Sequence, residues 1–260
     1  MTEKKTSILV VAAEKGGVGK TTTSFALAAG FARRGQSVLL VALDRQRNLN
    51  DYVGHCLTGK PTISEMLYFV VAGMQYDPAD CIVPLPDEGI DYIPSNDMFA
   101  SVNSVLANDS SSQEVLARFF RHEYFRRYDV ILLDCKPSLD LSVVNAFVAS
   151  TGILIPVQAE KFAMDMVHQI HDSYVKVKQT LNPGLCIAGI LLTMYNRTNM
   201  AAAVDESLRE TYGDLVLRTR ISRLVEATNS TAEQKSLVRM GGRLGEEYMA
   251  VVDELLQRGY

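Results

Sequence analysis

The sequence feature that most constrains the fold is a short apolar run followed by a glycine-rich loop and an alanine-rich segment. Residues Ile8–Ala13 are uniformly apolar, which is typical of a parallel strand buried on both faces. A helix is predicted after the loop, up to about Arg34, and Gly35 stands where a helix C-terminal glycine belongs. A strand, a glycine loop and a helix in this order predict a binding site for a phosphate chain. The loop reads Glu14-Lys15-Gly16-Gly17-Val18-Gly19-Lys20-Thr21-Thr22.

The residue types of this loop suit a nucleoside triphosphate. Glycines allow backbone N–H groups to approach phosphates closely, Lys20 is expected at the β- and γ-phosphates, and the Thr21 hydroxyl is expected on Mg²⁺. The strict GxxxxGK[ST] pattern is not met, because Glu14 holds the first glycine position and an additional lysine, Lys15, stands at the entrance. A glycine-rich turn with an incidental lysine is the alternative, which the flanking strand and helix disfavour. The predicted nucleotide-binding residues are Lys15, Gly16, Gly17, Val18, Gly19, Lys20, Thr21 and Thr22.

Two aspartates stand at the ends of other apolar runs. Asp134 ends the run Val130–Asp134, and Asp44 follows the run Ser37–Leu43. A carboxylate at such a strand end accepts a hydrogen bond from a Mg²⁺-bound water, and the carboxyl ends of parallel strands line one crevice. We therefore expect Asp134 to orient the metal and Asp44 to reach a water near the γ-phosphate, or the metal itself. For Asp134 alone, capping of a turn is the alternative.

The rest of the chain repeats this alternation of strands and helices. Ile153–Val157 and Leu185–Leu192 are further apolar runs, and amphipathic helices are predicted between and after them. The pattern predicts an α/β fold with a doubly wound, mostly parallel sheet flanked by helices. We expect one domain over residues 1–260. Ser111 followed by Glu114 fits a capping box and predicts the start of a helix.

Composition excludes several classes of protein. The formal net charge is −4, which excludes a uniformly basic nucleic-acid coat and leaves room for a local basic patch. The sequence has no apolar run of about 18 residues, so we expect no membrane span. The four cysteines lack zinc-like spacing and are expected to be free, buried thiols of a reducing compartment. His168 and His171 lie three residues apart without a supporting metal-ligand set, and we expect them to be solvated.

The motifs carry a resemblance to a known family over nearly the whole chain. KGGVGKTT with its additional lysine is the deviant Walker A motif and resembles ParA-type partition ATPases, whose relatives include MinD and the nitrogenase iron protein. The resemblance is strongest to the small, Soj-like chromosome-partition type, which lacks an N-terminal helix-turn-helix domain. Because the first strand is predicted to start at Ile8, we expect no such domain here. The other matching segments are RYDVILLDCKPSLDLSVVNA, ILIPVQAEKFAMD and GILLTMYNRTN.

The resemblance implies an ATP- and Mg²⁺-dependent sandwich dimer. Lys15 would reach the partner's phosphates, Asp44 would orient the attacking water, and Asp134 would hold the metal through water. Dimers of the family bind DNA without sequence preference, and arginines that match Arg197 and Arg223 face the DNA. A ParB-type centromere-binding partner stimulates slow hydrolysis. The resemblance thus implies a cytoplasmic, nucleoid-associated protein that partitions a plasmid or a chromosome.

The sequence also departs from the family pattern. DLDPQGN reads ALDRQRN, so Ala42 replaces an aspartate and Arg45 a proline, and Lys136 replaces the first proline of PPS. The SEAPS segment reads Val225–Ser230. Because Thr21, Asp44 and Asp134 remain, a working but slow ATPase is expected. The alternatives are a related ATPase that positions a protein assembly on the nucleoid, and a nucleotide-binding adaptor with weak hydrolysis.

Two further segments could be taken for binding surfaces, the C-terminal helix for a membrane surface and a cluster of arginines for a basic patch. The MinD branch ends in a basic amphipathic helix that docks on membrane. Here residues 243–260 carry two arginines and four acidic residues, so we expect this helix to pack on the core and no membrane partner. A cluster of arginines at positions 118, 121, 126 and 127 is expected at a helix end, where cations complement the helix dipole.

Overall fold

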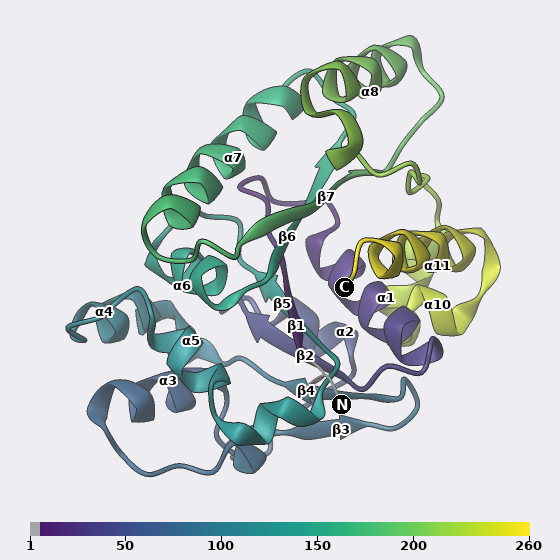
Figure 1. The fold of residues 1–260 in the computed structure, drawn as a ribbon. Coiled ribbons are helices and arrows are strands. Elements are labelled where there is room, and N and C mark those ends of the chain that lie inside the picture. Colours follow the sequence, from purple (N-terminus) through teal and green to yellow (C-terminus); the bar gives the residue numbers. More distant parts are fainter. Residues whose placement is uncertain (1–5) are drawn as a thin grey trace, which may run out of the picture.

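The computed structural model describes residues 6–260, which build a seven-stranded sheet with helices on both faces (Figure 1). The strand order is β3-β4-β2-β5-β1-β6-β7, and within it β3 runs antiparallel to β4 while the other neighbours pair in parallel. This confirms the predicted doubly wound, mostly parallel α/β fold. The strands are β1 (Ser7–Val11), β2 (Val38–Leu43), β3 (Val83–Leu85), β4 (Ile90–Ile93), β5 (Val130–Cys135), β6 (Gly152–Gln158) and β7 (Cys186–Thr193).

The helices follow the strands as crossover connections. Helix α1 links β1 to β2, α6 links β5 to β6, and α7 links β6 to β7. The helices are α1 (Lys20–Arg33), α2 (Asn48–Tyr52), α3 (Ile63–Ala72), α4 (Val102–Ala107), α5 (Val115–Phe120), α6 (Leu141–Ala149), α7 (Ala163–Thr180), α8 (Asn199–Tyr212), α9 (Glu226–Glu233), α10 (Leu237–Met240) and α11 (Gly242–Gln257).

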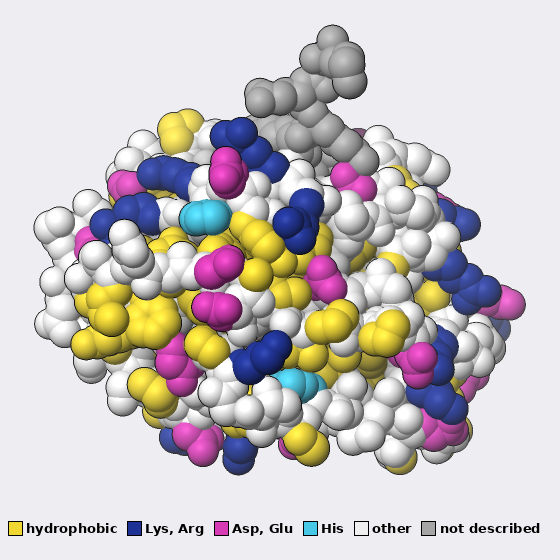
Figure 2. Space-filling model, turned by 90° about the horizontal axis from the view of Figure 1, so that it is seen from below, with side chains coloured by type: hydrophobic (Ala, Val, Ile, Leu, Met, Phe, Trp, Pro, Cys, Tyr) yellow, Lys and Arg dark blue, Asp and Glu magenta, His cyan; other side chains and the backbone are white. Residues whose placement is uncertain are grey.

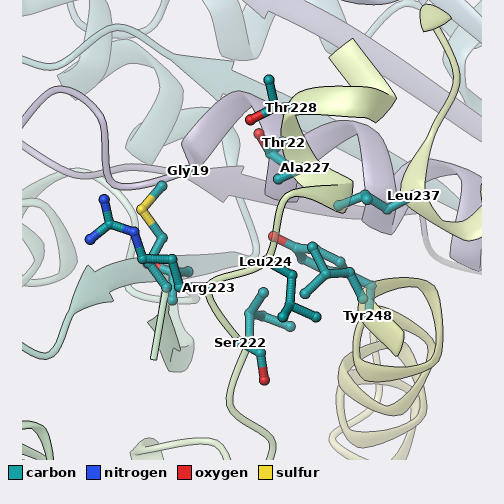
Figure 3. Close-up of a pocket in the computed structure, with 13 residues that line it drawn as sticks. Gly19, Thr22, Ser222, Arg223, Leu224, Ala227, Thr228, Leu237 and Tyr248 are labelled. Atoms are coloured by element: carbon teal, nitrogen blue, oxygen red, sulfur yellow. The ribbon is translucent and has the colours of Figure 1, made fainter. Parts of the chain in front are cut away.

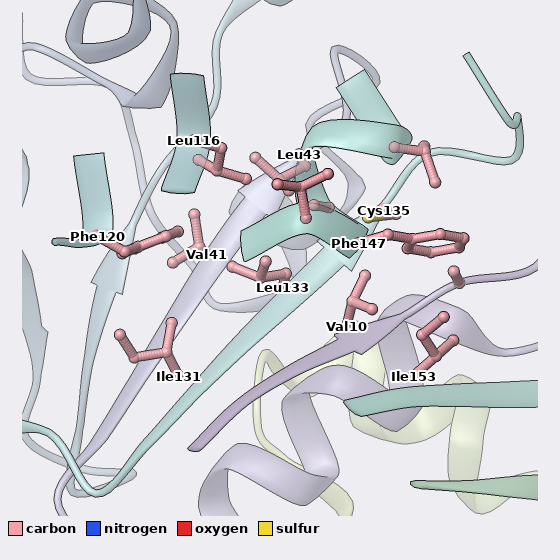
Figure 4. Close-up of a cluster of buried hydrophobic side chains, with 14 of the residues drawn as sticks. Val10, Val41, Leu43, Leu116, Phe120, Ile131, Leu133, Cys135, Phe147 and Ile153 are labelled. Atoms are coloured by element: carbon pink, nitrogen blue, oxygen red, sulfur yellow. The ribbon is translucent and has the colours of Figure 1, made fainter. Parts of the chain in front are cut away.

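Two apolar cores lie on opposite faces of the sheet. Successive residues of a strand point to opposite faces, so Val10 of β1 joins one core and Leu9 and Val11 join the other. Figure 4 shows the first core, where Val10, Val41 and Leu133 of three neighbouring strands lie beside side chains from the covering helices. Burial on both faces explains why the central strands read as continuous apolar runs and were predicted to within about two residues.

The capping box predicted at Ser111 does not form, although a helix follows this stretch as expected. Residues 110–114 form turns, and α5 begins at Val115. The Ser111 amide donates to Asp109 Oδ1 at 2.7 Å, and the Glu114 amide donates to the Ser111 carbonyl at 2.8 Å. These two bonds use the groups that a capping box would need. A genuine capping box that the sequence analysis passed over begins α3, where Thr62 and Glu65 bond each other's backbone.

The expectation that the cysteines are free and buried holds only in part. The four cysteines are free, and Cys81 and Cys135 are buried as expected, but Cys56 and Cys186 are exposed, which corrects the prediction for these two. Within residues 6–260, none of the helices has both the length and the apolarity that crossing a bilayer requires.

The last helix packs on the core, as predicted, and there it contacts the first helix. Leu244, Tyr248, Val251 and Leu255 of α11 are buried against α1, which lies beside α11 in Figure 1. The Tyr248 hydroxyl lies 3.1 Å from Thr23 Oγ1 of α1. The two helices approach closely at Gly30, where an added Cβ would lie 2.7 Å from Val252 Cγ2.

This contact generates a stability prediction. Gly30→Ala should lower the free energy of unfolding by about 1–2 kcal/mol, because Val252 is β-branched and has little freedom to move in a helix. The gain in helix propensity, up to about 1 kcal/mol, offsets only part of this cost. Urea unfolding measures it. Adding Val252→Ala should remove most of the penalty, and a Gly30→Ala variant at least as stable as the wild type would contradict the close approach.

Candidate nucleotide-binding site

The glycine-rich loop lies at the carboxyl edge of the sheet, between β1 and α1. β1 has β5 on one side and β6 on the other, so the loop stands where the chain's connections diverge to the two halves of the sheet. Open α/β sheets bind ligands at such a point. Gly17 and Gly19 have φ of 75° and 82°, a left-handed conformation that glycine adopts at little cost and other residues rarely adopt. The predicted loop is therefore formed, and in the expected place.

The N–H groups of this loop are available to a ligand. Within residues 6–260, the amides of Gly16, Gly17, Val18 and Gly19 donate no hydrogen bond. Helix α1 starts directly after them without a side-chain cap and without an acidic residue in its first turn. No residue of the helix itself therefore compensates the positive end of its dipole. Together these groups form an anion site of the kind that holds phosphates.

Lys20 places a buried cation at this loop. Its side chain is 7% exposed, and its Nζ donates to the Lys15 carbonyl at 3.0 Å. Burial lowers the pKa of the Lys20 ammonium, an effect that the charges of Asp134 and Asp44 partly oppose. An anion on the loop would favour the charged form of this lysine.

Thr21 and Asp134 come together as predicted. Thr21 Oγ1 donates to Asp134 Oδ2 at 2.9 Å, and Ser24 Oγ, which the sequence analysis did not single out, donates to Asp134 Oδ1 at 2.8 Å. Asp134 is 2% exposed, and this burial raises the pKa of its carboxyl to about 6 against the opposing effect of the two hydrogen bonds. A divalent cation would hold the carboxylate ionised.

The oxygen donors at this position fit Mg²⁺. Hydroxyl and carboxylate oxygens are its preferred ligands, and in nucleotide sites phosphates and water complete the shell, so one or two protein groups suffice. Over the described part of the chain, no three His, Cys, Asp or Glu side chains gather into a self-sufficient metal site. His168, one of the two helical histidines, instead lies with Nδ1 2.7 Å from the Tyr212 hydroxyl.

Asp44 lies at the same edge, directly after β2. Ala42 is paired in register with Asp134, which places Asp44 just beyond the metal-site carboxylate. Asp44 is half-buried, and its Oδ1 accepts a hydrogen bond from the Gln46 amide at 3.0 Å. The structure thus brings Asp44, Asp134 and the loop to one edge of the sheet.

Two departures from the family pattern have a visible structural consequence. Arg47 has φ 55°, the left-handed conformation that favours glycine, and the pattern DLDPQGN has glycine at that place. The sequence analysis passed over this replacement, which costs of order 1 kcal/mol of backbone strain. Lys136 pairs with Asp140 at 2.6 Å; burial by itself would raise the pKa of Asp140, but hydrogen bonds from Lys136 and other neighbours lower it to about 2. Lys136 is therefore engaged in an ion pair within its own loop.

Lys15 is paired within its own chain. Its Nζ lies 3.0 Å from Glu160 Oε2, just after β6, and both side chains are about half exposed, at 48% and 55%. The lysine therefore extends across the top of the sheet toward β6, away from its own helix α1.

A pocket of about 230 Å³ adjoins the loop, and the sequence analysis did not find it. Gly19 and Thr22 line one side, and Met194, after β7, lines another. Figure 3 shows Leu224, Leu237 and Tyr248 bordering it from segments late in the chain. The segments GILLTMYNRTN and Val225–Ser230, noted in the sequence, both contribute to its lining, but nothing in the sequence shows that they meet. A cavity lined by both apolar and polar side chains next to a phosphate site is suited to a nucleoside.

Arg197 and Arg223 lie close to this region and are exposed. The Arg223 amide donates to the Tyr195 carbonyl at 3.3 Å, which brings the two arginine segments side by side, and Arg223 also lines the pocket. In Figure 3 the Arg223 guanidinium points away from Leu237 and Tyr248. Neither arginine side chain has an ion-pair or hydrogen-bond partner among residues 6–260.

The other arginine groups are mostly engaged. Arg220 pairs with the buried Asp205, and Arg118 pairs with Asp109. Arg127 lies 3.9 Å from the centre of the Tyr124 ring. The face in Figure 2 shows acidic and basic side chains interspersed between apolar ones, in keeping with a chain that is not uniformly basic.

Known proteins share these features. A family model described as an AAA domain matches residues 6–187. The sporulation initiation inhibitor protein Soj of Bacillus subtilis is 33% identical over 255 residues, which cover 97% of this chain and 99% of Soj. The chromosome-partitioning ATPase Soj of Thermus thermophilus is 34% identical over 264 residues, with 98% and 100% covered.

A solved structure agrees with these relatives. Cobyrinic acid a,c-diamide synthase from Mycobacterium smegmatis, with bound ATP analog and magnesium, superimposes with a TM-score of 0.82 at 30% identity and covers 98% of this chain and 96% of that one. Matches of this extent include the glycine loop, the strand-end aspartates and the pocket segments alike. On this evidence the chain belongs to the ParA/Soj-type partition ATPases.

Proposed function

We propose that this protein binds Mg²⁺-ATP, dimerises around the nucleotide, and in the dimeric state binds DNA without sequence preference. Slow hydrolysis, stimulated by a ParB-type centromere-binding partner, would release it and so drive the partitioning of a plasmid or chromosome on the nucleoid. The observation that supports this most is the buried Lys20 beside unengaged loop amides, with Thr21 and Asp134 2.9 Å apart.

The loop and the pocket beside it together offer a place for the nucleotide. The triphosphate would lie on the loop, with Lys20 at the β- and γ-phosphates and the N-terminus of α1 nearby. Thr21 and, through water, Asp134 would hold Mg²⁺, which neutralises charge on the transferred phosphoryl group. The nucleoside would enter the pocket of about 230 Å³, since Gly19 and Thr22 border both the loop and the pocket.

The loop entrance suits a partner subunit. Lys15 and Glu160 form an exposed ion pair, and such pairs contribute less than about 1 kcal/mol. A partner's phosphates would therefore displace Glu160 at little cost. An added Cβ at Gly16 would meet no atom within 4 Å, so this side of the loop is open in the single chain.

One experiment tests the function as a whole. DNA retention on a sensor surface, measured with ATP, ADP and no nucleotide, should be substantial with ATP alone. Lys20→Ala should lose retention, because removal of the charge nearest the phosphates weakens ATP binding. Retention that is equal under all three conditions would refute an ATP-controlled DNA-binding dimer.

A nucleotide-binding adaptor with weak hydrolysis is the second candidate. Ala42, Arg45 and the strained Arg47 all lie around the proposed water-positioning residue, and they favour a reduced rate. The adaptor and the ATPase differ in the rate of phosphate release and in whether that rate depends on Asp44.

The related function of positioning a protein assembly would use the same nucleotide cycle. A gene for a partition protein beside this one would argue against that function.

Asp44 should control hydrolysis without controlling binding. Asp44→Ala should retain ATP binding and dimerisation but lose about 2–4 kcal/mol of transition-state stabilisation, about a 30- to 1,000-fold lower rate, because the attacking water is no longer positioned. Phosphate release measures this. Asp51→Asn, a change to an exposed acid on α2, is the control. Hydrolysis at the wild-type rate in Asp44→Ala would show that another residue positions the water.

Gly16→Val should block the dimer while the single chain still folds. The new side chain meets no atom of its own chain and would occupy the space that a partner needs. Light scattering with ATP, in the Asp44→Ala background to prevent hydrolysis, should show a monomer for Gly16→Val and a dimer for the parent. An unchanged thermal unfolding temperature verifies the fold. An ATP-dependent dimer of the variant would exclude a close approach at the loop.

Arg197 and Arg223 should bind DNA phosphates only in the dimer. Each substitution by alanine removes two charges per dimer, which should weaken binding to every sequence alike and reduce the slope of log affinity against log salt by up to about 2. Arg126→Ala is a matched control, because Arg126 is also exposed and has no side-chain partner among residues 6–260, but precedes β5 at the opposite edge of the sheet. Undiminished DNA binding by the double Arg197/Arg223 variant would place the DNA surface elsewhere.

A further inference from the structure

Side chains from two neighbouring strands hold carbonyl groups of the glycine loop. Gln158, the last residue of β6, donates from Nε2 to the Gly17 carbonyl at 3.1 Å. Thr193, the last residue of β7, donates from Oγ1 to the Val18 carbonyl at 2.9 Å. Both bonds join residues more than a hundred positions apart in the sequence, so they connect the loop to the far half of the sheet.

These bonds fix the orientation of two peptide groups. A trans peptide is planar, and its C=O and N–H point in opposite directions. The Gly17 carbonyl shares its peptide with the Val18 N–H, and the Val18 carbonyl shares its peptide with the Gly19 N–H. With both carbonyls held toward β6 and β7, both N–H groups point to the opposite side of the loop, where they donate no hydrogen bond within residues 6–260.

Without such anchors the loop would have alternative conformations. Gly17 and Gly19 flank the two peptides, and glycine adopts positive and negative φ with similar ease. Rotation of either peptide would replace an N–H by a carbonyl oxygen, which repels phosphate. The third held carbonyl, that of Lys15, is bonded by Lys20 itself, and this lysine would leave it for the phosphates.

We propose that Gln158 and Thr193 are positioning residues, which orient the Val18 and Gly19 amides toward the β-phosphate of the nucleotide. This inference rests on the proposed function, since it needs a phosphate chain on the loop. Both side chains act through carbonyl groups of the loop. Thr193 also borders the pocket beside the loop, but its hydroxyl is bonded to the Val18 carbonyl, and a valine of the same shape would leave the pocket wall in place. The two side chains therefore govern affinity for nucleotides that carry a β-phosphate and leave affinity for a nucleoside monophosphate nearly unchanged.

Thr193 offers a clean substitution. Thr193 is 1% exposed, and Thr193→Val keeps its shape while it removes the donor and leaves the Val18 carbonyl without a partner. Thr193→Ser is the matched control, because it restores the hydroxyl with a smaller side chain. Calorimetric titration with Mg²⁺-ADP and with AMP avoids hydrolysis. We expect about a tenfold loss of Mg²⁺-ADP affinity in Thr193→Val, the size of one lost hydrogen bond, and less than a twofold change for AMP.

The controls separate positioning from a purely structural role. Thr193→Ser should regain Mg²⁺-ADP affinity to within threefold of the wild type. An equal loss for AMP and Mg²⁺-ADP, or no loss for Mg²⁺-ADP, would overturn the inference. If Thr193→Val does not fold by circular dichroism, Gln158→Leu decides with the same two nucleotides. A wild-type chain that binds no Mg²⁺-nucleotide would refute the proposed function, whereas wild-type binding that both variants retain would refute this inference alone.

Discussion

The site depends on one buried contact, in which Thr21 and Ser24 of α1 both donate to the Asp134 carboxylate at the end of β5. This contact joins the first turn of the helix to the central strand and so fixes the position of the glycine loop relative to the end of β5. A buried carboxylate and the buried ammonium of Lys20 are each shifted by desolvation toward their neutral forms. An anion together with a divalent cation would restore the charge on both. The buried carboxylate and ammonium, which lower the stability of the empty chain, are thus complementary in charge to Mg²⁺ and to phosphate.

Sequence reasoning predicted the central sheet well because its strands are buried on both faces. For β1, β2, β5, β6 and β7 this burial leaves continuous apolar runs that are visible without any knowledge of the fold. The edge strand β3 is three residues long and partly exposed, and its neighbour β4 is buried but only four residues long, so neither gives a continuous apolar run. The capping box at Ser111 does not form because the Asp109 side chain accepts the hydrogen bond of the Ser111 amide in a turn, and the helix begins only at Val115. The capping box of α3 at Thr62 was overlooked although its spacing is visible in the sequence.

The same distinction separates what was predicted of the site from what was not. The loop and its neighbouring aspartates were predictable, because residues that directly follow parallel strands all lie at the carboxyl edge of the sheet. The pocket beside the loop was not, since Thr22, Met194, Leu224 and Leu237 are brought together only by tertiary packing. Gln158 and Thr193 escaped notice for a related reason. Each is an ordinary polar residue at a strand end until its partner carbonyl in the loop is known.

The edge that carries the site differs from the rest of the surface in having exposed arginines that lack acidic partners among the described residues. Most arginines away from this edge are engaged, as Arg34 is with Asp253 and Arg239 is with Asp87. Arg45, Arg197 and Arg223 lie at the carboxyl edge, exposed, and without a side-chain partner among the described residues. An arginine without an acidic partner keeps its full charge available to a ligand. These three side chains therefore supply local positive charge at the edge where the phosphates of a nucleotide would approach, in a chain whose net charge is −4.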